Sequence, residues 1–119
     1  MKILIVEDEA ALRVILEDIF FDEHDVRALG SGKRAIELLR GWQPEVLISD
    51  LELPGVPGED LAQAAALLPR RPRVILMSAE AERLELARPM ADVVLHKPFN
   101  LRELIRAIAP AHAGPLARP

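Results

Sequence analysis

The chain has 119 residues, half of them hydrophobic, no cysteine, and a formal net charge of −4. This length supports one domain with one ordinary core, and the lack of cysteine excludes disulfides and thiolate metal sites. The acidic balance disfavours direct nucleic-acid binding by this domain. The lack of a long apolar run or signal peptide predicts a cytoplasmic protein with no membrane partner.

Four short apolar runs and one segment of alternating apolar residues, 25–29, are separated by amphipathic stretches along the chain. Strands are predicted at residues 2–6, 25–29, 46–50, 74–77 and 92–95. Helices are predicted at residues 9–21, between Ser31 and Gly41, at 59–68, at 80–88 and between Asn100 and Ile108. Near-continuous apolar strands alternating with helices indicate a parallel sheet covered on both faces. We therefore expect an α/β doubly wound fold with five parallel strands in the order 2-1-3-4-5 and five helices.

Several helix ends carry specific signals. Ser31 is a suitable N-cap for the second helix, and Gly41 is expected to end that helix. Asn100 and Glu103 have the spacing of a capping box at the start of the last helix. The side chains expected on the buried face of this last helix are Leu101, Leu104, Ile105 and Ile108.

The last part of the chain differs from the rest. Residues 110–119 contain three prolines and a glycine and show no apolar periodicity. We expect residues 1–109 to form the domain and residues 110–119 to be a loose C-terminal tail or the start of a linker.

Polar side chains gather at the predicted carboxyl ends of the strands. Glu7 and Asp8 follow the first strand, and Asp50 ends the third. Ser78 and Lys97 follow the fourth and fifth strands. In the order 2-1-3-4-5, the crevice between strands 1 and 3 is the usual ligand site, so these five residues are expected to converge there.

The chemistry of these groups points to phosphoryl transfer. Three clustered carboxylates require a cation, and oxygen ligands without histidine or cysteine favour Mg²⁺ (or Mn²⁺). Asp50 can act as a nucleophile toward phosphorus, while Lys97 and the Ser78 hydroxyl neutralise and orient phosphoryl oxygens. Ser78 could also be an ordinary helix cap, a role compatible with the first.

This arrangement resembles the receiver domain of response regulators, the CheY-like module of bacterial two-component signalling, over about residues 2–108. The matching features, in chain order, are Glu7-Asp8, Asp50, Pro54, Gly58, Ser78 and Lys97-Pro98-Phe99. The resemblance implies a phosphoprotein in which Asp50 accepts a phosphoryl group from a sensor histidine kinase or phosphotransfer protein. It also implies a phosphoacceptor that switches an unknown output partner, rather than an enzyme.

The resemblance further implies a division of roles within the site. Mg²⁺ would be bound by Asp8, Asp50 and the backbone carbonyl of Glu52, with Glu7 acting through water. Lys97, Ser78 and Ala79 would bind the phosphoryl group. Glu52 and Glu80 occupy the two positions that tune dephosphorylation in the family. We expect their like charge to disfavour attack by water; the alternative is that one of them orients the water.

The sequence departs from the family pattern in the part that transmits the signal. The position of the family's switch aromatic, three residues before the lysine, is Val94, and the chain has no tyrosine. The segment from Ser78 to Lys97 is shorter than the family norm by nearly one helical turn, which predicts a short or irregular fourth helix. We expect signalling to rely on the Ser78 loop and this helix, with Val94 only packing. A homodimer remains compatible with the family.

Other functions use related features. A Mg²⁺-dependent aspartyl-phosphate phosphatase of the haloacid-dehalogenase type has a similar kit, but its nucleophile follows the first strand. A flavodoxin-like protein would need a hydroxyl- and glycine-rich loop where this chain has Glu7-Asp8-Glu9. A receiver that acts without phosphate, and a receiver module of a larger DNA-binding regulator, are further alternatives.

Overall fold

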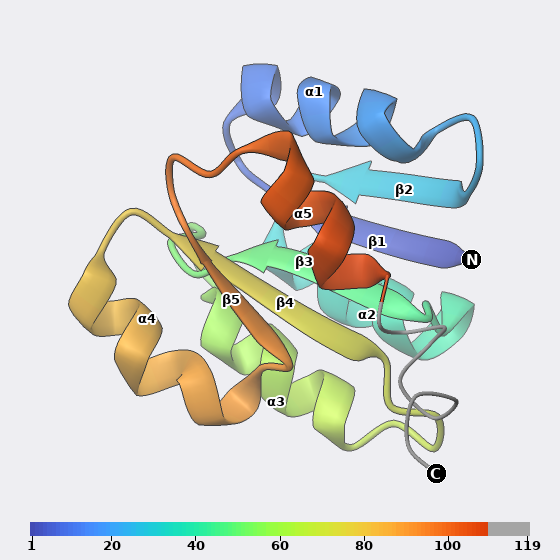
Figure 1. The fold of residues 1–119 in the computed structure, drawn as a ribbon. Coiled ribbons are helices and arrows are strands. Elements are labelled where there is room, and N and C mark those ends of the chain that lie inside the picture. The colour runs from blue at the N-terminus through green and yellow to red at the C-terminus, as the bar shows by residue number, and fades with distance from the viewer. Residues whose placement is uncertain (110–119) are drawn as a thin grey trace, which may run out of the picture.

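The structure is a computed structural model that describes residues 1–109; the predicted tail at 110–119 lies outside the described residues. It contains one five-stranded parallel sheet in the order β2-β1-β3-β4-β5, which confirms the predicted topology (Figure 1). The strands are β1 (Lys2–Val6), β2 (Asp25–Leu29), β3 (Val46–Asp50), β4 (Arg73–Ser78) and β5 (Val93–His96).

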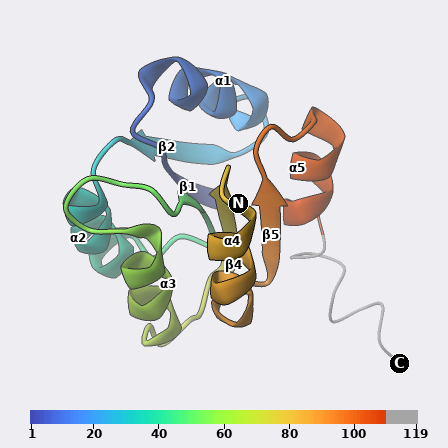
Figure 2. The same ribbon diagram turned by 90° about the vertical axis from the view of Figure 1, so that its left-hand side faces the viewer.

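Within residues 1–109, five α-helices cover the sheet. They are α1 (Ala10–Phe20), α2 (Gly32–Trp42), α3 (Gly58–Ala66), α4 (Ala81–Ala87) and α5 (Leu101–Ile108), and a 3-10 turn (Arg88–Met90) extends α4. Helices α1 and α5 lie on one face of the sheet, and α2, α3 and α4 lie on the other (Figures 1 and 2). None of the helices within residues 1–109 is long and apolar enough to cross a membrane.

Each strand contributes to two cores because its side chains alternate between the faces of the sheet. In β1, Leu4 and Val6 pack under α2 and α3, whereas Ile3 and Ile5 pack under α1 and α5. All of these side chains are fully buried. This burial on both faces explains why β1, β3 and β4 read as near-continuous apolar runs.

The predicted caps of α2 and α5 are present. The Ser31 hydroxyl accepts a hydrogen bond from the Arg34 backbone N–H at 3.3 Å. At α5, the Asn100 side chain accepts from the Glu103 N–H at 2.8 Å, and the Glu103 carboxylate accepts from the Asn100 N–H at 3.1 Å. Both reciprocal bonds of the capping box are therefore formed.

The prediction that Gly41 ends α2 is wrong. The helix continues to Trp42, and Gln43 adopts the left-handed conformation at its end, with a φ of 53°. The Gln43 N–H donates to the Leu39 carbonyl, as a left-handed cap does. Trp42 is buried in the core under α2, so burial of its ring extends the helix past the glycine.

The buried face of α5 is narrower than predicted. Leu104 and Ile108 are buried, but Leu101 and Ile105 are 52% and 46% exposed. The sheet is covered by the stripe formed by Leu104, Ala107 and Ile108, and the other two side chains lie to one side of that stripe. A two-turn helix at the sheet edge buries only this stripe.

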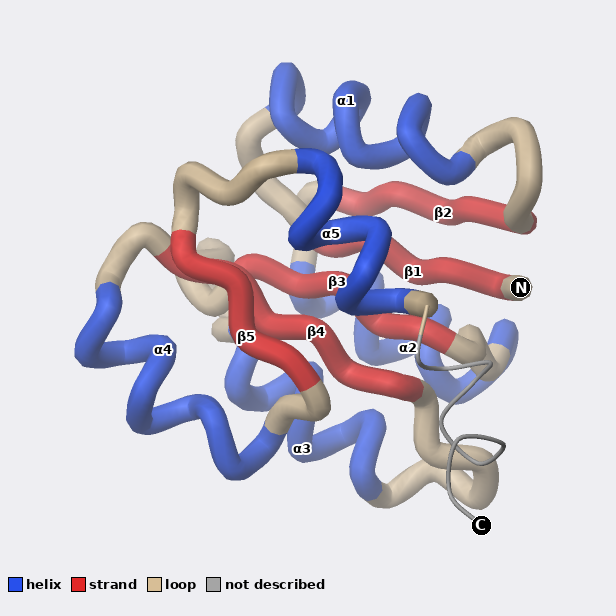
Figure 3. Tube along the Cα trace, in the orientation of Figure 1, coloured by secondary structure: helices blue, strands red, loops and turns tan. Residues whose placement is uncertain are grey.

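The fourth helix is short, as the sequence predicts. It has seven residues, followed by the three-residue 3-10 turn. The loops after β1, β3, β4 and β5 gather at one end of the sheet (Figure 3), where the predicted site residues lie.

Candidate functional site

The carboxyl ends of β1 and β3 bring three acids together. One carboxylate oxygen from each of Glu7, Asp8 and Asp50 lies within 4.8 Å of the other two. Glu7 and Asp50 are buried, and Asp8 is exposed. Since β1 and β3 are direct neighbours in the sheet, the prediction that these acids converge is confirmed.

Lys97 joins the acids from the end of β5. Its Nζ atom lies 2.6 Å from Asp50 Oδ2 and 2.8 Å from Glu7 Oε1. The Lys97 backbone N–H donates to the Ser78 carbonyl at 2.8 Å, which continues the β4–β5 pairing, and the Lys97–Pro98 peptide bond is cis. Tertiary structure thus brings one ammonium group between two carboxylates that are far from it in the sequence.

The surroundings shift the ionisation of these groups. Burial raises the pKa of Glu7, and its hydrogen bonds from Lys97 and the Glu9 backbone N–H only partly offset this effect. Burial acts to lower the pKa of Lys97, but its hydrogen bonds to Asp50 and Glu7 outweigh burial and raise that pKa. Lys97 therefore stays charged at neutral pH and neutralises part of the acidic cluster.

The three acids fit a hard cation. They face one ammonium group, so negative charge is in excess, and within residues 1–109 no hydrogen bond or ion pair reaches the Asp8 carboxylate. All three donors are oxygens, which suits Mg²⁺ or Mn²⁺ better than a softer metal. Glu7, Asp8 and Asp50 are therefore suitable to hold such a cation.

The loop after Asp50 passes very close to α3. The Glu52 N–H donates to Asp50 Oδ1 at 3.1 Å, so Lys97 and this N–H together engage both oxygens of the Asp50 carboxylate. A Cβ atom on Gly58 would collide with the Asp50 carbonyl oxygen and would lie 2.8 Å from Leu51 Cα. Glycine is therefore required at position 58 for the loop to fold back beside the strand end.

Ser78 is fully buried at the end of β4. Its hydroxyl donates to Glu52 Oε2 at 2.6 Å and accepts from the Glu80 N–H at 2.9 Å. The second bond is the local capping role that the sequence also allows. The bond to Glu52 was not predicted, and it means that the hydrogen of the Ser78 hydroxyl points to the Glu52 carboxylate. The adjacent Ala79 is exposed and shares a hollow with Leu12, Lys97, Pro98 and Phe99.

Arg83 of α4 is a site residue that sequence reasoning missed. Its guanidinium forms two bonds to the Glu59 carboxylate, at 2.8 and 3.0 Å, and one to the Leu51 carbonyl at 3.0 Å. It also lies 3.5 Å from Glu52 Oε2. The only sequence signal is a basic residue five positions after Ser78, because its partners come from other elements.

Arg13 was also missed. Its guanidinium donates to the Glu7 carbonyl at 2.8 Å and to the Asp8 carbonyl at 3.4 Å. Arg13 lies in the first turn of α1, and its bonds fix the position of the backbone that carries Glu7 and Asp8.

Glu52 lies between Asp50, which its backbone N–H contacts, and the side chains of Ser78 and Arg83. Burial is the main cause of its raised pKa, and the nearby Asp50 raises it further, while Ser78 and Arg83 act in the opposite direction. Glu80 is exposed and contributes its backbone N–H to Ser78. The Glu52 carboxylate is thus placed beside the site but directed to Ser78 and Arg83.

Val94 is half-buried and packs in the core that contains Leu84 and Ala87 of α4. This environment agrees with the expected packing role.

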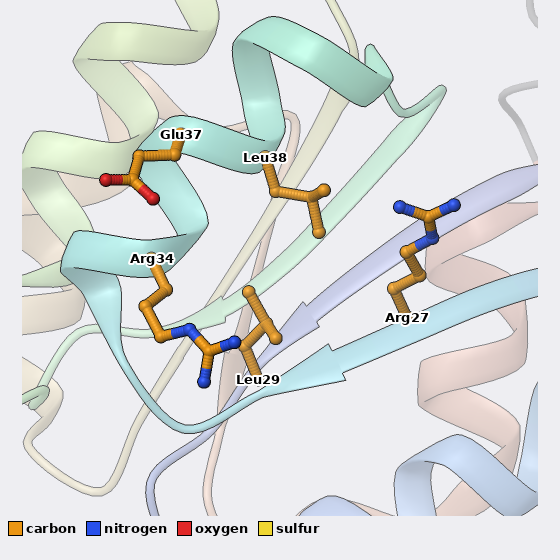
Figure 4. A pocket seen from close by; sticks show the side chains of 5 residues that line it. All are labelled: Arg27, Leu29, Arg34, Glu37 and Leu38. Carbon is orange, nitrogen blue, oxygen red and sulfur yellow. The ribbon is translucent and has the colours of Figure 1, made fainter.

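A separate hollow lies between β2 and α2 and is lined by Arg27, Leu29, Arg34, Glu37 and Leu38 (Figure 4). None of the predicted site residues lines it.

The fold and the site define a class of protein: a doubly wound α/β domain with an acidic crevice and a lysine at the β1–β3 switch point. The response regulator receiver domain family matches residues 3–109. The chain therefore belongs to this family, the receivers of two-component systems. Receivers are phosphoacceptors rather than classical enzymes. The family match over residues 3–109 favours a receiver over the haloacid-dehalogenase and flavodoxin alternatives.

Similar proteins come from several bacteria. The chain is 27% identical over 112 residues to sporulation initiation phosphotransferase F of Bacillus subtilis, covering 90% of each chain. It is 34% identical over 111 residues to the transcriptional regulatory protein PdtaR of Mycobacterium tuberculosis, covering 90% of this chain and 54% of PdtaR. It is 33% identical to TcrA of the same species, covering 100% of this chain and 49% of TcrA. The chain thus spans about half the length of these mycobacterial relatives.

Solved structures show the same fold. The N-terminal domain of an uncharacterized Wolinella succinogenes protein is 27% identical, with a TM-score of 0.86 and coverage of 100% of this chain and 99% of that one. The receiver domain of a LuxO repressor protein from Vibrio parahaemolyticus is 25% identical, with a TM-score of 0.84 and coverage of 99% and 97%. The Thermotoga maritima regulator TrrA, solved in complex with Mg²⁺–BeF, is 24% identical, with a TM-score of 0.78 and coverage of 92% and 97%.

Proposed function

We propose that this chain is a phosphorylation-dependent switch in which Asp50 accepts a phosphoryl group from a sensor histidine kinase or phosphotransfer protein. The observation that carries the proposal is the Asp50 carboxylate, which is buried at the switch point, paired with Lys97 at 2.6 Å and grouped with two further acids. Residues 1–109 would form the receiver domain, acting in the cytoplasm.

A divalent cation would assist at this site. Asp8, Asp50 and the backbone carbonyl of Glu52 would hold Mg²⁺ or Mn²⁺, with Glu7 acting through water. The excess of carboxylates over ammonium groups and the unpaired Asp8 carboxylate within the described residues support this assignment. When bound, the cation supplies positive charge that neutralises phosphoryl oxygens.

The transfer step follows from the groups around Asp50. A carboxylate oxygen of Asp50 attacks phosphorus, and the bond from phosphorus to the donor's imidazole nitrogen breaks, leaving the electron pair on that nitrogen. Lys97 remains protonated and stabilises the negative charge of the resulting acyl phosphate. Ser78 and the Ala79 backbone N–H would donate to phosphoryl oxygens.

A protein donor is supported by the surface beside the site. Leu12, Pro98 and Phe99 line the hollow next to Lys97, and Ile15, one turn further along α1, is 56% exposed. An apolar surface beside a buried nucleophile suits a macromolecular partner that must place its phosphoryl group at Asp50. The output partner is unknown, and several relatives of about twice this length are named as DNA-binding or transcriptional regulators.

The two glutamates near the site would lengthen the life of the acyl phosphate. Glu52 is partly buried beside Asp50, and Glu80 follows Ser78. Their charge would disfavour the approach of water and the negative transition state. We expect Glu52→Ala and Glu80→Ala each to shorten the lifetime of the adduct; unchanged or longer lifetimes would contradict shielding.

The direct test is incubation with acetyl phosphate and Mg²⁺, followed by intact-protein mass spectrometry. The wild-type chain should gain one phosphoryl group, and Asp50→Asn should gain none. Asp60→Asn, which changes an exposed acid on α3, is the matched control and should be modified like the wild type. A folded wild-type protein that gains no phosphoryl group would refute the proposal.

A further inference from the structure

The Ser78 hydroxyl has only one hydrogen to donate. In this structure the hydrogen is directed to Glu52 Oε2 at 2.6 Å, and the hydroxyl oxygen accepts from the Glu80 N–H. A phosphoryl oxygen on Asp50 would therefore have to compete with Glu52 for the same hydrogen. The carboxylate of Glu52 is the acceptor that Ser78 must leave.

Arg83 fixes that acceptor. Its guanidinium lies 3.5 Å from the same Glu52 Oε2 atom that Ser78 contacts. Two bonds to Glu59 and one to the Leu51 carbonyl hold the guanidinium at the start of α3 and the end of β3. One side chain of α4 thus connects the acceptor of the Ser78 hydroxyl with two other elements.

Phosphorylation would change the balance of charge around Glu52. A phosphoryl group on Asp50 adds negative charge next to Glu52, because the Glu52 backbone N–H already donates to Asp50 Oδ1. Repulsion then favours movement of the Glu52 carboxylate away from Asp50, while Ser78 turns to the phosphoryl oxygens. Arg83 is the cation that can follow this movement, and it belongs to α4.

We propose that Arg83 is a positioning residue that couples Ser78 to α4: through Glu52 it holds the Ser78 hydroxyl away from Asp50 in the unmodified protein, and it transmits the release of Ser78 to α4. This inference rests on the proposed phosphorylation of Asp50. In this family an aromatic side chain at the position of Val94 helps to transmit the signal of phosphorylation. The inference assigns that transmission to Arg83 and Glu52 instead.

The packing of α4 suits this role. The helix has seven residues and buries only Leu84 and Ala87, so few apolar contacts hold it in one position. Val94 packs against the same core without a polar group to follow the phosphoryl charge. The contacts of Arg83 are therefore the side-chain polar link between α4 and the site within the described residues, beside the bond from the Glu80 backbone N–H to Ser78 at the start of the helix.

The test measures hydrogen–deuterium exchange of residues 81–90 in the full chain, with and without acetyl phosphate and Mg²⁺. Wild type should show a phosphorylation-dependent change in this segment. Arg83→Gln should still form the adduct but lose most of that change. Glu52→Gln is compared with wild type at equal adduct occupancy, because its adduct is expected to be shorter-lived, and it should lose the same change. The double variant should lose no more than either single variant. Non-additivity of this kind indicates that the two residues act as one unit.

Arg88→Gln is the matched control, because it removes a charged pair of the same helix region, Arg88 with Glu85, that does not reach the site. It should keep the full response. A normal response in Arg83→Gln, loss of the response in Arg88→Gln, or loss of the adduct in Arg83→Gln would each overturn the inference. An adduct on wild type with unchanged exchange would overturn only this inference, whereas no adduct on wild type would overturn the proposed function and the inference together.

Discussion

Two groups of polar contacts meet at Asp50 and differ in burial. On one side, Lys97, Glu7 and Asp50 have side chains that are 19%, 1% and 5% exposed. On the other side, Arg83, Glu52 and Glu59 are 32%, 34% and 24% exposed. Charges shielded from water interact more strongly and tolerate fewer arrangements than charges that water can solvate. The first group therefore suits fixed chemistry, and the second suits rearrangement.

The largest effect should come from removing the ammonium group of Lys97. Lys97→Met leaves Glu7 and Asp50 as uncompensated buried acids, so we expect a loss of about 3–5 kcal/mol in the free energy of unfolding at neutral pH. The measurement is denaturant unfolding in EDTA. Mg²⁺ should restore part of the loss if the acids bind it. A variant as stable as wild type in EDTA would show that the two groups do not differ in this way.

A second prediction concerns pH and Glu7. Since burial raises the pKa of Glu7 in the folded state, its contribution favours folding below its ordinary value of 4.5 and is lost as the pH rises through the raised value. Glu7→Gln removes this loss. Unfolding free energies measured in EDTA should therefore shift in favour of the variant as the pH rises above 4.5. Parallel pH curves for the two proteins would contradict a raised pKa of Glu7 in the folded state.

Arg83 should matter much less for stability than Lys97. Its partners are partly solvated, and exposed ion pairs typically contribute about 0–1 kcal/mol. We expect Arg83→Gln to lower the unfolding free energy by at most about 1 kcal/mol in the same denaturant experiment. A loss as large as that of Lys97→Met would place Arg83 among the residues that hold the fold together.

The smallest effect is expected at Val94. Its side chain only packs against the core beside α4, so Val94→Tyr should leave adduct formation and the phosphorylation-dependent exchange of residues 81–90 unchanged. Mass spectrometry and hydrogen exchange measure the two quantities in one sample. A larger exchange response in the variant would show that an aromatic side chain adds transmission beyond Glu52 and Arg83.

Local signals in the sequence were sufficient where one side chain acts on its own neighbours. Ser31 and the Asn100–Glu103 pair form the expected caps because each bond spans three residues. Gly41 failed as a helix end because the burial of Trp42, a tertiary effect, extends α2. Leu101 and Ile105 failed as core residues because the sheet edge covers only part of the α5 surface.

The sequence by itself determined the sheet and the place of the site. Apolar runs that alternate with helices specify parallel strands, and parallel strands carry their terminal residues to one end, so Glu7, Asp8, Asp50 and Lys97 had to meet. Only the tertiary structure decided where the Ser78 hydroxyl points and which acids Arg83 joins. These contacts depend on the paths of loops and the positions of helices. Residues far apart in the chain determine both, so no local sequence pattern predicts the contacts.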